Sequence, residues 1–111
     1  MLSVRVQRNK DASANAVVLA LAGELDMATA PDLRQAIVAV VADGATDLVL
    51  DLSEVSFCDS VGLGIIVGGL KRARSHGGDL RLRAVPDRLA DTLALTGLDR
   101  AITVEPSVAS A

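Results

Sequence analysis

Apolar and polar residues alternate along several short stretches of the chain, which is the pattern of a strand with one buried face. Such alternation is found in 2–7, 48–52 and 80–84, and two further strands are predicted over the apolar run 17–22 and over 102–104. A polar segment from Arg8 to Asn15 separates 2–7 from 17–22, and it predicts a turn that joins them as an antiparallel hairpin. Gly23 is expected to end the second strand.

Between the later strands, apolar residues recur at helical spacing. The first predicted helix has Thr29 as its N-cap and ends at Gly44, with an apolar stripe of Leu33, Ile37, Val40 and Val41. A loop over 53–59 leads into a second helix from Ser60 to Ser75, which Gly77 and Gly78 terminate. The third helix starts at Pro86 and Asp87 and stops at Gly97, with Leu89, Leu93 and Ala94 facing inward.

The resulting order, β-β-α-β-α-β-α-β, predicts an α/β fold with a mixed, mainly parallel sheet. The strand over 80–84 alternates leucine with Arg81 and Arg83, so one of its faces is polar. A parallel sheet covered on both sides would be apolar on both faces, and we therefore expect helices mostly on one face. The chain is predicted to be one domain over 1–111, with a core of about 4–104 and a frayed tail over 105–111.

Composition excludes several classes of function. Among 111 residues there is one Phe and no Tyr or Trp, and the formal net charge is −3. A net negative charge and the near absence of aromatic side chains that could stack on bases argue against nucleic acid as a partner. The negative charge also argues against binding to an anionic membrane surface. The most apolar run, 61–70, is too short to span a bilayer, and the single cysteine, Cys58, favours a cytoplasmic location.

The segment 57–64 turns from a loop into a helix, and Asp59 or Ser60 is its N-cap by residue type. On spacing alone, a plain cap is the simpler interpretation. The alternative is a functional hydroxyl, because the free N–H groups and the dipole of a helix N-terminus stabilise an anion. A phosphoryl group on Ser60 would find such a site.

Other candidate sites are weaker. The glycines Gly62, Gly64, Gly68 and Gly69 fail the dinucleotide pattern at Val67, and no Walker lysine motif is present, so close helix packing is the expected role. His76 cannot serve Cys58 or Ser60 as a base, since it lies roughly 24 Å along the helix from Ser60. Cys58 is expected to be buried and His76 solvated. No ligand spacing supports a metal site made of Asp26, Asp51 and Asp59.

Three segments of the chain together resemble the STAS domain family, and more narrowly the bacterial anti-sigma factor antagonists. These are Gly23-Glu24-Leu25-Asp26, Thr29-Ala30, and the run from Leu50 to Gly64 with its Asp59-Ser60-x-Gly62-Leu63 element. The similarity extends over roughly Val4 to Val104.

The resemblance implies a protein-binding switch and no enzyme activity, cofactor or metal. In that family the unphosphorylated antagonist binds an anti-sigma factor, which is also a serine kinase, and frees a sigma factor. The kinase ends the contact by phosphorylating the serine that Ser60 matches, and a phosphatase reverses this. Asp59 and Asp26 match the family's acids, and Val61 and Gly62 complete the implied partner site.

Two departures from the family pattern stand out. Val61 replaces a second Ser or Thr, and the C-terminal helix is nearly absent beyond Glu105. Two alternatives remain open: a STAS adaptor subunit of a stress-signalling or lipid-transport complex that is never phosphorylated, and a nucleotide-binding protein.

Overall fold

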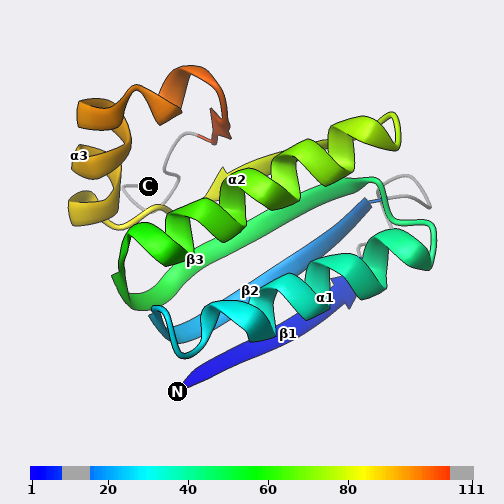
Figure 1. Ribbon diagram of the computed structural model, residues 1–111, viewed down its shortest axis with the longest axis horizontal. Coiled ribbons are helices and arrows are strands. Elements are labelled where there is room, and N and C mark those ends of the chain that lie inside the picture. Colours follow the sequence, from blue (N-terminus) through cyan, green and yellow to red (C-terminus); the bar gives the residue numbers. More distant parts are fainter. Residues whose placement is uncertain (9–15, 106–111) are drawn as a thin grey trace, which may run out of the picture.

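The computed structural model describes residues 1–8 and 16–105, which form one sheet with its helices (Figure 1). Within these residues the five strands lie in the order β1-β2-β3-β4-β5. β1 and β2 are antiparallel, and the other neighbours are parallel. The strands are β1 (Leu2–Arg8), β2 (Ala16–Leu25), β3 (Asp47–Cys58), β4 (Asp79–Arg83) and β5 (Thr103–Val104). The predicted hairpin and the mainly parallel sheet are thus confirmed.

The helices lie where the sequence places them. They are α1 (Ala30–Ala42), α2 (Ser60–Ser75) and α3 (Asp87–Thr96), and a 3-10 turn, Leu98–Arg100, follows α3. Figure 1 shows α1 and α2 side by side on the same face of the sheet, with α3 set apart near the start of α2. No helix in the described part of the chain has both the length and the apolar character needed to cross a membrane.

Strand register explains why the helices cover one face. Leu19, Leu50 and Leu82 are paired across β2, β3 and β4, and all three are fully buried beneath the helices. On the opposite face, Ala20, Asp51 and Arg83 are paired in the same way. One face therefore supplies the apolar layer that stabilises the fold. The other face is mixed, because Val18 and Val49 are buried on it while Asp51, Arg81 and Arg83 give it polar positions, and the polar face predicted from the strand over 80–84 is confirmed for that strand.

Two strands run further than the sequence predicts. β2 does not end at Gly23 but continues to Leu25, because Gly23 has a φ of 109° and lies within an irregular stretch of the β2–β3 register. The predicted loop over 53–59 is also wrong up to Cys58, because β3 pairs with this continuation of β2. The extended ends of β2 and β3 thus place Asp26 and Asp59, which directly follow them, at one end of the sheet.

Smaller expectations need correction. Arg8 belongs to β1, and the rest of the predicted turn, 9–15, lies outside the described residues, as does 106–111 of the predicted tail. β4 ends at Arg83, and Ala84 has a φ of 54°. Ala94 is exposed, because α3 packs only through the stripe that holds Leu89 and Leu93. The predicted bounds of α2 are confirmed.

Candidate functional site

Ser60 is the first residue of α2 and is exposed to solvent. It follows β3 directly, separated only by Asp59, so the end of the longest strand fixes its position. Within the described residues, the N–H groups of Ser60 and Val61 have no hydrogen-bond acceptor. An anion attached to Ser60 Oγ would meet these two donors and the positive end of the helix dipole.

Asp59 is the N-cap of α2, which decides between the two residues that the sequence left open. One carboxylate oxygen accepts a hydrogen bond from the Gly62 N–H at 2.9 Å. The other accepts from the Met27 N–H at 3.2 Å, and the Asp59 N–H donates to the Leu25 carbonyl at 3.1 Å. Asp59 therefore joins the segment after β2 to the first turn of α2, and it holds Ser60 at the junction.

Asp26 and Thr29 organise the neighbouring segment. Asp26 Oδ1 accepts hydrogen bonds from the N–H groups of Ala28 at 2.9 Å and Thr29 at 3.1 Å. Thr29 occupies the N-cap position of α1, as predicted, but its side chain makes no capping bond. Its buried hydroxyl instead donates to the Glu24 carbonyl at 2.7 Å. Sequence alone gave no sign of this inward role for Thr29.

Apolar side chains are exposed around the junction that holds Ser60. Met27 is 73 % exposed, Phe57 is 52 % exposed and Val61 is 42 % exposed. Val61 adjoins Ser60, and the Met27 backbone is bonded to Asp59. Large apolar side chains at the surface beside a polar group are typical of a protein-binding face. The sequence singled out Val61, but the exposure of Met27 and Phe57 carried no signal in the pattern of the chain.

The glycines of α2 fall into two classes, so the prediction of close packing is only half right. A Cβ at Gly62 would lie 2.7 Å from Leu25 Cγ, and one at Gly69 would lie 2.8 Å from Ile37 Cδ1. At Gly64 and Gly68 an added Cβ would meet nothing within 4 Å. Gly62 thus lets the start of α2 approach the end of β2, which is the contact that positions Ser60.

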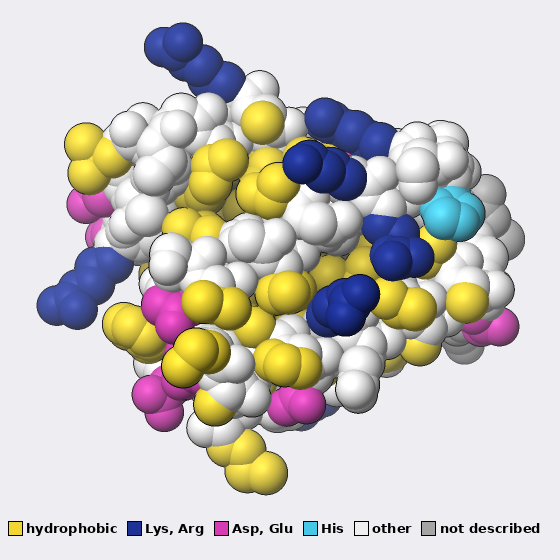
Figure 2. Space-filling view, in the orientation of Figure 1, with side chains coloured by type: hydrophobic (Ala, Val, Ile, Leu, Met, Phe, Trp, Pro, Cys, Tyr) yellow, Lys and Arg dark blue, Asp and Glu magenta, His cyan; other side chains and the backbone are white. Residues whose placement is uncertain are grey.

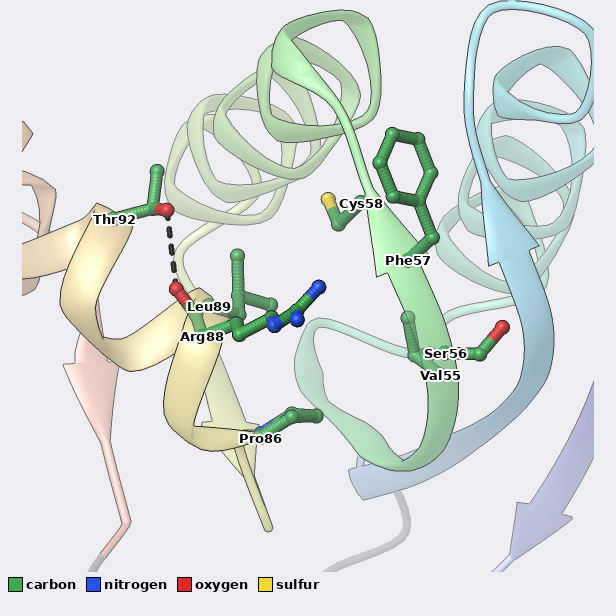
Figure 3. A pocket seen from close by; sticks show the side chains of 8 residues that line it. All are labelled: Val55, Ser56, Phe57, Cys58, Pro86, Arg88, Leu89 and Thr92. Carbon is green, nitrogen blue, oxygen red and sulfur yellow. Dashed lines mark hydrogen bonds between the residues drawn. The ribbon is translucent and has the colours of Figure 1, made fainter.

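A shallow pocket of about 200 Å³ separates the end of β3 from α3 (Figure 3). Its lining comprises Val55, Ser56, Phe57, Cys58, Pro86, Arg88, Leu89 and Thr92. Arg88 extends from α3 toward β3, and the thiol of Cys58 is turned toward α3. Pockets that enclose small molecules usually exceed about 300 Å³. The size of this pocket suits one side chain of a docked protein better than a metabolite.

Cys58 is half-buried, in partial agreement with the expected burial. Burial, and to a smaller extent the neighbouring Asp59 carboxylate, raises the pKa of its thiol from 9.0 to about 11. The thiol is therefore protonated at neutral pH and is a poor nucleophile.

We expect slow alkylation of Cys58 by iodoacetamide at pH 7–8. A pKa of about 11 in place of 9.0 lowers the thiolate fraction at neutral pH about 100-fold. The rate should keep rising with pH up to about 11, and urea-unfolded protein should react far faster at pH 8. Mass spectrometry of timed samples measures both rates, and equal rates would contradict the burial of this thiol.

The remaining candidate residues are His76 and the acidic side chains. His76 is exposed at the far end of α2, and its Nδ1 lies 2.9 Å from the Arg72 carbonyl oxygen, so it is remote from Ser60 and Cys58. In residues 1–8 and 16–105, no three His, Cys, Asp or Glu side chains are grouped closely enough to hold a metal ion. Asp51 faces the polar side of the sheet, where its carboxylate accepts the Ser53 N–H.

Comparison with known proteins adds to this geometry. The STAS family model described as "Mlab, STAS domain" matches residues 9–105. An anti-sigma-B factor antagonist of Bacillus subtilis is 37% identical over 103 residues, which cover 93% of this chain and 90% of that protein.

Solved structures show the same fold. The crystal structure of an anti-sigma factor antagonist from Mycobacterium paratuberculosis superposes with a TM-score of 0.83 at 34% identity, over 99% of this chain and 90% of that one. A Bacillus cell fate determinant, SpoIIAA in its phosphorylated form, superposes with a TM-score of 0.72 at 22% identity, over 94% and 92% of the two chains.

Proposed function

This chain belongs to the STAS domain family, and on that premise we propose that it acts as an anti-sigma factor antagonist. In this role the unphosphorylated chain binds an anti-sigma factor that is also a serine kinase, and a sigma factor is released. Phosphorylation of Ser60 ends the contact, and a protein phosphatase restores it. The names of the relatives support the binding of an anti-sigma factor, and the geometry at Ser60 supports its phosphorylation.

The observation that carries the proposal is the placement of Ser60. Its hydroxyl is exposed at a helix N-terminus, next to a fixed carboxylate and among exposed apolar side chains. Val61 adjoins Ser60 in the chain and the Met27 backbone is bonded to Asp59, so a partner that binds these apolar side chains comes close to Ser60. The proposed partner site therefore comprises Asp26, Asp59, Ser60 and Val61 together with these apolar side chains. Gly62, which the sequence also placed in the site, is buried and supports it from beneath by letting α2 lie close to β2.

The phosphoryl transfer needs nothing from this chain except the hydroxyl. Ser60 Oγ attacks the γ-phosphorus of an ATP held with magnesium by the kinase, the bond to the β-phosphate oxygen breaks, and ADP leaves. The hydroxyl proton is lost to a base of the kinase. In this role the chain is a binding protein and a kinase substrate, and it is not an enzyme. We place it in the cytoplasm, with no nucleic acid or membrane as its partner.

Two experiments separate this role from the alternatives. The full chain is incubated with its anti-sigma kinase and ATP-magnesium, and the modified residue is mapped by mass spectrometry. We expect phosphate on Ser60, its loss in Ser60→Ala, and its retention in the matched control Ser56→Ala. Phosphate on Ser53, Ser56 or Thr29 would show that the site is wrong, and no phosphate at all would favour the constitutive adaptor.

Nucleotide binding tests the remaining alternative. Because no glycine loop of the phosphate-binding type precedes Lys71, calorimetric titration of the isolated chain with ATP or GTP should give no measurable heat of binding. Micromolar affinity would favour a nucleotide-binding protein instead.

A further inference from the structure

A groove of about 240 Å³ lies between α1 and α2, outside the site around Ser60. It is lined chiefly by Arg34, Val38, Gly64, Ile65, Gly68 and Arg72. The space exists because Gly64 and Gly68 have no side chain, and because no other part of the structure fills it. Glycine within a helix lowers stability relative to alanine, and packing requires it at neither position. The fold alone thus does not account for this opening.

The groove is basic, although the chain as a whole is acidic. Arg34 from α1 and Arg72 from α2 line it together, both are exposed, and neither is ion-paired with any residue that the structure describes. Among residues 1–8 and 16–105, no Asp or Glu lines the groove. Figure 2 shows several Lys and Arg side chains over the middle and right of this face and others at its upper-left and left edges, with acidic side chains mainly toward the lower left. Two unpaired guanidinium groups in one concave site favour a carboxylate.

The groove continues the surface around Ser60. Val61, Ile65, Gly68 and Arg72 follow one another at helical spacing, so they lie along one side of α2. Val61 is next to Ser60, and Arg72 lies three turns further on. A protein that docks over Ser60 and extends along α2 therefore passes over the groove.

We propose that this groove receives an acidic segment of the anti-sigma partner, with a carboxylate held by Arg34 and Arg72. The inference rests on the proposed function and adds the chemistry of the partner. The apolar walls formed by Val38 and Ile65 suit a peptide that carries apolar side chains between its acidic ones, whereas a free phosphate ion would leave them uncovered. A bilayer is a poorer fit, because the groove is concave and the acids at the Ser60 end would repel anionic lipid.

The test uses the full chain, labelled with ¹⁵N, and a short peptide that alternates glutamate with leucine. We expect saturable shifts of the Gly64 and Gly68 amide signals, which weaken as salt is added, and no such shifts with the matching lysine–leucine peptide. The double variant Arg34→Glu/Arg72→Glu should bind the acidic peptide at least about tenfold more weakly, equal to about 1.4 kcal/mol. Arg100→Glu, which is exposed outside the groove, is the matched control and should bind as the parent does.

A second variant tests the groove by shape. Gly68→Leu places a side chain in the opening and leaves both arginines in the chain, and it should abolish peptide binding while the melting temperature is kept or raised. If the charge-reversed and the filled variants both bind the peptide like the parent, the proposal is wrong. It is also wrong if inorganic phosphate or phosphatidylglycerol vesicles shift the same amides at lower concentration than the peptide.

Binding of the anti-sigma partner separates this inference from the proposed function. If the parent chain binds the partner and the double variant binds it equally well, only the acidic-segment inference fails. If the parent chain neither binds the partner nor accepts phosphate on Ser60, the proposed function fails with it. Weaker partner binding by the double variant, with unchanged binding by Arg100→Glu, supports both.

Discussion

Ser60→Glu and Ser60→Asp are expected to bind the anti-sigma partner at least about 100-fold more weakly than the parent chain, equal to about 2.7 kcal/mol. The docked surface would have to bury an added negative charge beside Asp59 and Asp26, and an uncompensated buried charge costs several kcal/mol. Ser60→Ala adds no charge, so it should bind like the parent and remain bound when kinase and ATP are added. Surface plasmon resonance with the immobilised partner measures all three.

The fold should hardly respond to the same substitutions. Ser60 is exposed, and the free N–H groups of the first turn of α2 favour a negative group by typically about 0.3–1 kcal/mol. The nearby Asp59 carboxylate opposes this by repulsion. We therefore expect a change in unfolding free energy below about 1 kcal/mol, which moves the melting temperature by only a few degrees.

Ser53→Glu is the matched control, because it adds the same charge at an exposed position on the polar side of the sheet. It should leave partner binding unchanged. Acidic Ser60 variants that unfold, or that bind as tightly as the parent, would rule out repulsion at a preformed surface as the mechanism.

Gly62→Ala should lower the free energy of unfolding by about 1–3 kcal/mol, the usual cost of overpacking. Its new Cβ would lie 2.7 Å from Leu25 Cγ, 2.8 Å from the Leu25 carbonyl oxygen and 3.1 Å from Cys58 Sγ. The same carbonyl accepts the Asp59 N–H, so relief of the clash moves the start of α2 away from β2. For a domain of this size the loss corresponds to a fall in melting temperature of about 5–15 °C.

Gly64→Ala provides the control two residues further along the same helix. An added Cβ there meets nothing within 4 Å, so the variant should gain up to about 1 kcal/mol from the better helix propensity of alanine. Urea unfolding of the parent and the two variants measures both the expected loss of unfolding free energy in Gly62→Ala and the expected gain in Gly64→Ala. If both substitutions stabilise the protein, α2 does not approach β2 as closely as described.

The elements that the sequence predicted correctly are those with strong local signals. α2 begins at Ser60 because Asp59 is a good N-cap, and Gly77 follows its end. The buried strand residues were visible because leucine stands at alternate positions in the first half of β3 and in β4. The second half of β3 was missed because Ser53 and Glu54 interrupt that alternation, and only pairing with β2 keeps the segment extended.

The site was predicted less completely, although one signal was overlooked. Gly62 and Gly69 share a face of α2 with the buried Ile66, whereas Gly64 and Gly68 share a side with the exposed Arg72. Helical spacing could therefore have separated packed glycines from open ones. No local pattern could show that Asp59 bonds to Met27, since these residues are 32 positions apart and meet only once β2 and β3 pair.

The order of the strands in the sheet is also their order in the chain, and this bears on how the protein is made. No strand has to wait for a later one to be inserted between it and its neighbour. At translation rates of about 5–20 residues per second, the β1–β2 hairpin can form seconds before β3 has been synthesised. Each later strand then adds to the open edge that the previous one left. The growing sheet can therefore assemble in the direction of synthesis, one strand at a time.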